Sequence, residues 1–231
     1  MTVTARASTG SKALDELLGG GLEPGVITQL YGEPGCGKST LCIIAAVATL
    51  RSGRAVIWID TEGLSIERFA QVAGDEADEL SERLYLFEPG DFREQGTVIV
   101  DAGRLLEKLS CPAGLIVLDS ATALYRTELE IGREALRALS SQMVRLLGIS
   151  RKYGIPALIT NQVYMDPESG TFHPLGGTAL AHLSKAIVAI EKVNAVRRAV
   201  LKKHRSLPDG RELYFEMVTA GISRVSRPGT R

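Results

Sequence analysis

The sequence is poor in aromatic residues and carries no excess charge of either sign. Phe, Trp and Tyr make up 5% of its 231 residues, which argues against a base-stacking sheet of the RRM type. Lys and Arg together number 27, as do Asp and Glu, so the net charge is zero. Contact with nucleic acid must therefore depend on a local patch of basic residues rather than on bulk charge.

Cysteines are few, and long apolar runs are absent from the sequence. Cys36, Cys42 and Cys111 have neither the spacing of a zinc site nor a secretory context, so we expect free thiols in a reducing cytoplasm. The longest apolar run, LCIIAAVATL, stops after ten residues at Arg51, which predicts a buried helix rather than a membrane span. The N-terminus lacks the apolar core of a signal peptide. These features predict a soluble, cytoplasmic protein with no membrane partner.

Apolar runs alternate with helical patterns along most of the chain. VITQLY, AVIWID, LYLFE, LIVLD and ALITN have the pattern of buried strands, and helices are predicted over 38–52, 93–109 and 133–153. This alternation indicates a mostly parallel sheet with helices on both faces. Beyond Gly176 three strand-like runs follow closely, which predicts C-terminal β-hairpins. We expect one α/β domain over 1–231, with flexible tails at 1–9 and 223–231.

The stretch GEPGCGKST matches the pattern G-x-x-x-x-G-K-[ST] without a mismatch. Its glycines let the backbone turn N–H groups toward an anion, and the following helix adds the positive end of its dipole. A strand before the loop and a helix after it are the context that the motif requires, whereas a chance glycine-rich turn is the alternative. The predicted ATP-binding residues of the loop are Gly32, Glu33, Pro34, Gly35, Cys36, Gly37, Lys38, Ser39 and Thr40.

Residues in and beyond the loop can supply the chemistry of an ATPase. Lys38 would neutralise the β- and γ-phosphates, and the Ser39 hydroxyl would bind Mg²⁺. Asp119 ends the LIVLD run at the edge where parallel sheets bind ligands, so it is the second predicted metal ligand, with a helix N-cap as the alternative. Glu62 follows AVIWID and can activate a water, unless it is an ordinary loop carboxylate. Cys36 beside a helix N-terminus suggests a low-pKa thiol; a small residue in a tight loop is the alternative.

Four segments, IDTEG, DSATALYR, LITNQV and PLGGTALAH, resemble the successive core motifs of the RecA-type recombinases in order and spacing. The resemblance extends from about residue 8 to 222 and implies a RecA-like P-loop ATPase core that binds ATP and Mg²⁺. It further implies that Glu62 activates water and that Gln162 reads the γ-phosphate and relays its state to DNA-contacting loops. Arg68 falls where relatives place an arginine on the adenine ring, with a helix-surface charge as the alternative.

The resemblance also extends to a site shared between subunits. Lys203-His204-Arg205 resembles the K-x-R element that RecA-like ATPases insert into the active site of a neighbouring subunit, where a cation stabilises transition-state charge. Lys203 and Arg205 are therefore predicted catalytic residues in trans. This implies a homo-oligomer that assembles through the ATP site.

Two groups of basic residues are candidates for binding DNA phosphates. Arg126, Arg133 and Arg137 flank the segment that resembles the first DNA loop of the family. Lys202 belongs to a basic run in the predicted hairpins, for which solvated charges that discourage edge pairing are the alternative. Because few aromatic residues accompany these cations, we expect binding without sequence specificity to single-stranded DNA, with double-stranded DNA as a further candidate.

The chain departs from full recombinases of the RadA type in two respects. Only about ten residues precede the core, without the helix-hairpin-helix domain or the phenylalanine linker of those enzymes. The segment 163–174 is shorter than their second DNA loop and contains Asp166 and Glu168 but no Lys or Arg. We therefore expect a weakly ATP-hydrolysing accessory protein of homologous recombination and DNA repair that assists a RadA-type recombinase. A KaiC-like ATPase or kinase acting on proteins, a minimal self-sufficient recombinase and a pure ATP switch are the alternatives.

Overall fold

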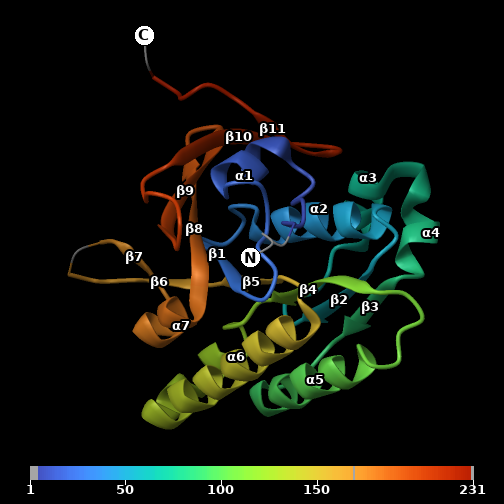
Figure 1. Ribbon diagram of the computed structural model, residues 1–231. Helices are drawn as coiled ribbons and strands as arrows, with labels where there is room; N and C mark the ends of the chain where they lie inside the picture. The colour runs from blue at the N-terminus through green and yellow to red at the C-terminus, as the bar shows by residue number, and fades with distance from the viewer. Residues whose placement is uncertain (1–4, 169, 230–231) are drawn as a thin grey trace.

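The computed structural model describes residues 5–168 and 170–229. Within them, nine strands form one sheet in the order β11-β10-β9-β8-β1-β5-β4-β2-β3 (Figure 1). Strands from β8 to β3 in this order pair in parallel, whereas β9, β10 and β11 extend the sheet as antiparallel hairpins. The bounds are β1 (Ile27–Gly32), β2 (Ala55–Asp60), β3 (Leu84–Phe87), β4 (Ala113–Asp119), β5 (Ala157–Asn161), β8 (Ser184–Val193), β9 (Val196–His204), β10 (Glu212–Val218) and β11 (Gly221–Arg224).

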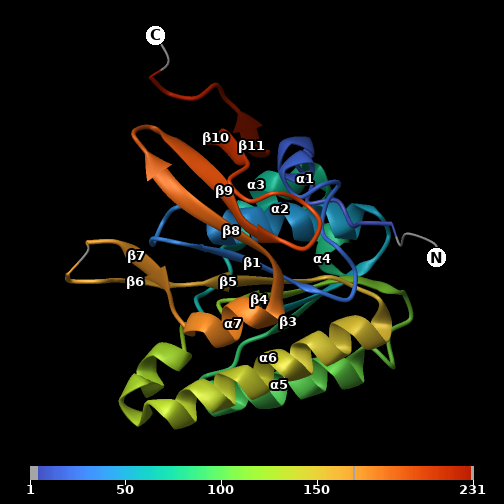
Figure 2. The ribbon, with the colours of Figure 1, turned by 60° about the vertical axis from the view of Figure 1, so that its left-hand side comes forward.

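Helices cover both faces of the sheet (Figure 2). One face carries α1, α2, α3 and α4, and the other carries α5 and α6. The bounds are α1 (Lys12–Leu17), α2 (Lys38–Arg51), α3 (Ile66–Ala73), α4 (Ala77–Ser81), α5 (Phe92–Leu105), α6 (Arg133–Tyr153) and α7 (Gly177–Leu183), with 3₁₀ segments η1 (Gly74–Glu76) and η2 (Tyr125–Ile131). This arrangement is the predicted α/β architecture.

The central strands are mostly apolar because both of their faces are buried. Side chains alternate between the faces along a strand. In β2, Val56 and Trp58 enter the core beneath α2, whereas Ile57 and Ile59 enter the core formed with α5 and α6. A strand covered on one face only would show polar residues at alternate positions. The apolar run in AVIWID is therefore typical of a strand that is covered on both faces.

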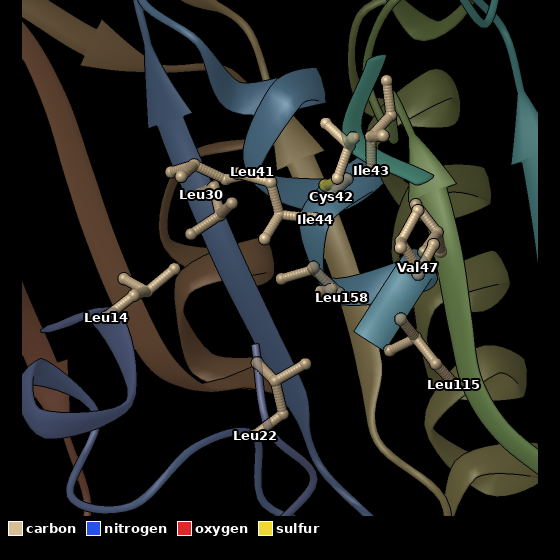
Figure 3. Packing of buried hydrophobic residues seen from close by; sticks show 14 of the residues in the cluster. Leu14, Leu22, Leu30, Leu41, Cys42, Ile43, Ile44, Val47, Leu115 and Leu158 are labelled. Carbon is tan, nitrogen blue, oxygen red and sulfur yellow. The ribbon is translucent and has the colours of Figure 1, made fainter. Parts of the chain in front are cut away.

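The first core is centred on α2, which contacts the sheet, α3 and β11. Figure 3 shows Leu30 of β1, Leu115 of β4 and Leu158 of β5 gathered around Ile44 and Val47 of this helix. Because neighbours surround α2, it is apolar around most of its circumference rather than along one stripe. The prediction that LCIIAAVATL forms a buried helix is confirmed.

Most element boundaries agree with the sequence patterns, and the exceptions are short. Helix α6 spans Arg133–Tyr153 as predicted, whereas α5 ends at Leu105 and the chain continues in hydrogen-bonded turns. The structure adds the helix α7 and a hairpin formed by β6 (Val163–Met165) and β7 (Phe172–Pro174), in a segment that we predicted as a loop. The C-terminal hairpins are confirmed, with β11 as an additional strand.

Parts of both predicted tails contact the domain. Ala7 pairs with Leu22, and Thr9 is buried. At the other end, β11 extends to Arg224, and Val225 donates its N–H to the carbonyl of Tyr214. Residues 1–4 and 230–231 of these tails lie outside the described residues. The flexibility of the tails and the single-domain division stay predictions.

The parallel strands bring four functional segments to one edge of the sheet. β1, β5, β4 and β2 are neighbours in this order and point the same way. Their carboxyl ends therefore meet, and this edge is where open parallel sheets bind ligands. None of the helices in the described part of the chain is long and apolar enough to cross a membrane.

Candidate nucleotide-binding site

The glycine loop connects the end of β1 to the first turn of α2, which is the geometry of an anion cradle. Gly35 and Gly37 have φ angles of 68° and 105°, in the region that favours glycine because it has no Cβ. A Cβ at Gly37 would also lie 1.8 Å from Cε of Met217 in β10. The loop therefore requires glycine here for its backbone conformation, and the tip of the Met217 side chain occupies the space beside it.

Lys38 is buried at the base of the loop. Its Nζ donates hydrogen bonds to the carbonyls of Gly32 at 2.9 Å and Glu33 at 3.1 Å. The ammonium group is thus held beside the loop by carbonyl acceptors, in a position from which it can contact a bound phosphate. A second cation approaches the loop from β8, where Lys192 donates to the carbonyl of Pro34 at 2.8 Å. We predicted Lys192 only as part of the basic run, because sequence spacing does not show which strand lies beside the loop.

Ser39 and Asp119 lie together beneath the loop, as the predicted metal site requires. Asp119 is 3% exposed and accepts hydrogen bonds from the Thr160 hydroxyl, at 2.5 Å, and from Ser39. Burial raises the pKa of Asp119, and the bonds from Thr160 and Ser39 partly oppose this rise.

These residues fit Mg²⁺ rather than a metal with an all-protein ligand set. The described residues contain no cluster of three or more His, Cys, Asp or Glu side chains that could hold a metal ion. Mg²⁺ in nucleotide sites is commonly bound by one or two protein oxygens, with phosphates and water completing its octahedron. One hydroxyl and one carboxylate, Ser39 and Asp119, match this requirement.

Glu62 and Gln162 meet over the same edge of the sheet. Gln162 follows β5 and donates its Nε2 to the Glu62 carboxylate, which follows β2. The turn that carries Glu62 is fixed by Asp60, whose carboxylate accepts from the N–H groups of Glu62 at 3.2 Å, Gly63 at 2.9 Å and Leu64 at 2.5 Å. Asp60 therefore orients the loop, and Glu62 is exposed and available to a ligand.

Gln162 retains an unused acceptor at this edge. Its Oε1 is buried and has no hydrogen-bond partner among the described residues. A buried polar atom without a partner is unfavourable, so such atoms commonly face a ligand or water. The amide nitrogen of Gln162 therefore donates to Glu62, and its oxygen can accept a hydrogen bond from a ligand or water in the site.

The predicted phosphate residues line a cavity of about 360 Å³, which we call the phosphate cavity. The glycine loop and the start of α2 form one side. Glu62, Arg126, Gln162 and Val163 also line the cavity, and Met217 of β10 completes the lining. This volume is within the usual range for small-molecule sites. We did not predict Arg126 or Met217 as members of the cavity.

Arg68 is not among the residues that line the phosphate cavity, and its contacts lie elsewhere. Its guanidinium donates to the carbonyls of Val218 at 2.8 Å, Thr219 at 3.0 Å and Gly221 at 3.1 Å, in the turn between β10 and β11. These bonds fix the turn of the hairpin whose Met217 side chain approaches Gly37. The contact of Arg68 with adenine stays a prediction.

The low pKa suggested for Cys36 is wrong, whereas the alternative of a small residue in a tight loop agrees with the structure. Cys36 is fully buried, and burial raises the pKa of its thiol more than the nearby Lys38 and Lys192 lower it. Cys36, Cys42 and Cys111 are all free thiols, as predicted.

Lys203 and Arg205 lie away from the phosphate cavity of their own chain. Strand β9 runs antiparallel to β8, so it begins near the edge that carries the glycine loop and ends at the opposite edge. There Lys203 donates to the carbonyl of Ala181 at 2.6 Å, and Arg205 forms an ion pair with Glu23. This position excludes a role in the cavity of the same chain and is compatible with the predicted role in a neighbouring one.

The structure separates the two predicted groups of DNA-binding residues. Arg133 and Arg137 are exposed in the first turns of α6, near the edge that carries the phosphate cavity. Lys202 is exposed near the far end of β9. Two members of the basic run in the hairpins form ion pairs, since Arg198 pairs with Glu191 and Glu212, and Arg205 with Glu23.

The glycine loop, the Ser39–Asp119 pair and the parallel sheet define a P-loop nucleotide-binding protein with a RecA-like core. A model of the Rad51 family matches residues 2–225. The chain therefore belongs to the Rad51 family, among its RadB proteins.

Three comparisons illustrate the similarity. The DNA repair and recombination protein RadB of Methanoculleus marisnigri is 61% identical over 96% of this chain and 99% of its own. That of Archaeoglobus fulgidus is 44% identical over 93% of this chain and 96% of its own. A crystal structure of the RadB recombinase is 40% identical, with a TM-score of 0.80, and the alignment covers 95% of this chain and 100% of that chain. The predicted resemblance and RecA-like fold are confirmed.

Proposed function

We propose that this protein is an accessory ATPase of DNA recombination and repair. It binds ATP with Mg²⁺ in the phosphate cavity, hydrolyses ATP slowly, and assists a principal recombinase of the RadA type. The observation that carries the proposal is the hydrogen bond between Gln162 and Glu62, which both line the phosphate cavity with the glycine loop. This bond joins the predicted water-activating carboxylate to the residue that precedes the β6–β7 hairpin.

The roles of the site residues follow from their positions. Backbone N–H groups of the glycine loop and the Nζ of Lys38 bind the phosphates, while Ser39 and Asp119 hold Mg²⁺. Mg²⁺, when bound, neutralises charge that develops on the phosphate oxygens. Glu62 orients a water and accepts its proton as the oxygen attacks the γ-phosphorus.

Bond formation by this water breaks the link between the γ-phosphorus and the bridging oxygen, which leaves as part of ADP. Lys38 stabilises the negative charge that remains on the phosphates.

Slow turnover is expected for two reasons. Gln162 donates a hydrogen bond to Glu62, so this carboxylate oxygen must exchange the amide for a water before it can accept a proton. The predicted trans cations Lys203 and Arg205 lie at the opposite edge of the sheet, so an isolated chain lacks them in its own cavity. Assembly through the ATP site would supply them from the next subunit.

Gln162 also supports a route from the nucleotide to a distant surface. It is followed directly by Val163–Met165 of β6, which pairs with β7 in the hairpin that extends from the domain (Figure 1). A phosphate that attracts Gln162 away from Glu62 would shift the start of this hairpin. The ATP-bound form would thereby present a different surface to the recombinase or to DNA.

DNA binding is proposed for the exposed cations at the start of α6. Arg133 and Arg137 are one helical turn apart and share a face, so both can reach phosphates of one strand. The absence of Lys and Arg from segment 163–174 leaves the second loop without phosphate ligands. We therefore expect modest, sequence-independent affinity for single-stranded DNA, and weaker binding to duplex DNA.

The salt dependence of DNA affinity tests this interface. Each phosphate contact to single-stranded DNA contributes roughly 0.7 to the slope of log K against log salt concentration. The double substitution Arg133→Ala and Arg137→Ala should reduce the slope by about 1.4, whereas Lys202→Ala, the matched control, should have a smaller effect. Equal effects of both variants would contradict the proposed interface.

Strand-exchange assays test the accessory role. The protein alone should exchange strands poorly and should stimulate exchange when added with ATP to a RadA-type recombinase. Efficient exchange by the protein alone would support a minimal recombinase instead. ATPase activity that ignores DNA at every salt concentration would favour an enzyme that acts on proteins.

A further inference from the structure

We propose that Arg126 is a γ-phosphate-binding residue of the ATP site and acts within its own chain. This inference rests on the proposed ATP-binding function and adds a cation to the phosphate cavity. Arg126 lines the cavity together with the glycine loop, Glu62 and Gln162. From the sequence we had expected Arg126 to be a DNA contact.

The position of Arg126 in the cavity indicates that it would contact the γ-phosphate rather than another part of ATP. A P-loop lysine contacts the β- and γ-phosphates, so the chain of phosphates extends across Lys38 with its terminal group farthest from the nucleoside. Glu62, the predicted water-activating residue, must face that terminal group. Arg126 lines the same cavity as Glu62 and Gln162, and all three follow the carboxyl ends of neighbouring strands.

The charge of Arg126 is available for a ligand. Its side chain is exposed, and in the described part of the chain no hydrogen bond or ion pair involves its guanidinium. Glu62 is the carboxylate that lines the same cavity, and it accepts a hydrogen bond from Gln162. A guanidinium offers five N–H donors in a planar fork that suits phosphate oxygens.

The backbone that carries Arg126 is held firmly. The preceding residue, Tyr125, is buried, and its ring lies 5.7 Å from that of Phe92. Arg126 itself donates its N–H to the carbonyl of Thr122 at 3.1 Å. The hydroxyl of Thr122 accepts the N–H of Gln162 at 3.0 Å. Thr122 therefore anchors the backbone of both Arg126 and Gln162, so the segments that carry the cation and the amide are held close to each other.

The same segment connects the cavity to the proposed DNA interface. Arg126 is the second residue of η2 (Tyr125–Ile131), which leads through Gly132 into α6. A γ-phosphate bound by Arg126 would restrain η2 and, with it, the first turn of α6, where Arg133 lies. ATP and ADP would then differ in their effect on DNA affinity because ADP cannot engage Arg126.

Nucleotide affinities measured without DNA test this inference, because a residue that only contacts DNA cannot affect them. The wild type, Arg126→Ala and the matched control Arg145→Ala, which changes an exposed arginine of α6, should each be titrated with Mg²⁺–ADP and with a non-hydrolysable Mg²⁺–ATP analogue. Arg126→Ala should lose roughly tenfold or more in affinity for the ATP analogue and should bind ADP as the wild type does. Arg145→Ala should match the wild type for both nucleotides.

Arg126→Lys and Arg126→Gln complete the experiment. The lysine variant keeps the charge and should recover part of the preference for ATP over ADP, whereas the glutamine variant should not. Glutamine also replaces alanine in the comparison if Arg126→Ala does not fold. An unchanged preference in the alanine or glutamine variant, or equal losses for both nucleotides, would overturn the inference. Failure of the wild type to bind either nucleotide would instead refute the proposed function.

Discussion

The side-chain amide of Gln162 donates a hydrogen bond to the carboxylate of Glu62, which is 100 positions away in the sequence. The bond joins the ends of β5 and β2 across β4, which lies between them in the sheet. Only one group of the amide is used, because Oε1 of Gln162 is buried without a partner among the described residues. The amide can therefore exchange its contact with Glu62 for contacts with a bound nucleotide and water.

We predict that Gln162→Ala separates ATP hydrolysis from DNA. ATP affinity should change less than about threefold, since Lys38 and the loop remain. ATP turnover should no longer respond to single-stranded DNA, because the start of the hairpin has lost its contact with Glu62. Steady-state hydrolysis with and without DNA measures the effect, and Tyr164→Ala in the hairpin is the control. A variant that DNA stimulates as strongly as the wild type would exclude Gln162 as the relay.

Asp119→Asn should stabilise the protein without nucleotide and abolish its response to Mg²⁺–ATP. Burial raises the pKa of Asp119, so the ionised carboxylate disfavours folding near neutral pH. A change of about 1 kcal/mol shifts the melting temperature of a domain of this size by roughly 2–4 °C, and we expect a rise of that order. Added Mg²⁺–ATP should raise the melting temperature of the wild type but not that of the variant.

The difference in stability between Asp119→Asn and the wild type should depend on pH in one direction. The folded chain binds the Asp119 proton more tightly than the unfolded chain does, so protonation favours folding. The gap between Asp119→Asn and the wild type should therefore be largest at neutral pH and narrow as the pH falls toward the ordinary carboxyl pKa of 3.8. A gap that widens on acidification, or a less stable variant at pH 7, would contradict this account.

Cys36 should resist thiol reagents even though it lies within the phosphate loop. It is fully buried, and burial raises its thiol pKa, so little thiolate forms at neutral pH. Cys111 is partly exposed and should react first, which makes it the internal control. Mass spectrometry after timed treatment with iodoacetamide identifies the modified residue. Rapid modification of Cys36 that ATP prevents would restore the interpretation of a reactive thiol.

The sheet could be predicted from the sequence because its strands are buried on both faces. The first five residues of AVIWID are all apolar, and α6 has the length and periodicity that define a helix. The β6–β7 hairpin could not be predicted in this way. Its strands have three residues each, which is too short for an alternating pattern, and Tyr164, Met165 and Phe172 are exposed.

In the candidate site, too, some features could be predicted from the sequence and others could not. Motif spacing places the loop, Asp119 and Glu62 at one edge, since each follows an identifiable strand. Arg126 in the cavity and Met217 against Gly37 depend on the 3₁₀ turn of η2 and on the position of β10 in the sheet. Sequence spacing determines neither the direction of a side chain from a turn nor the strand order among hairpins. The charge of Arg126 and its place beside the segment that resembles the first DNA loop therefore suggested a DNA contact.

Mixed assemblies should reveal whether Arg205 acts in a neighbouring subunit. Arg205 lies at the edge of the sheet opposite its own glycine loop and pairs with Glu23, a bond that would have to release before it could reach a partner's ATP. Arg205→Ala should bind ATP nearly as the wild type does but hydrolyse it more slowly, by roughly tenfold or more. Arg224→Ala, which removes another exposed ion pair, should leave turnover unchanged.

Arg205→Ala and Lys38→Ala should restore activity to each other when mixed. An interface between the two variants contains one site with Lys38 from the first chain and Arg205 from the second, so it is whole. The substitution Lys38→Ala removes the loop cation and should by itself abolish ATP binding while the fold is retained. Turnover measured across mixing ratios should therefore rise to a maximum near equal amounts. No recovery at any ratio, together with wild-type hydrolysis that stays proportional to protein concentration down to the monomer, would place the complete site within one chain.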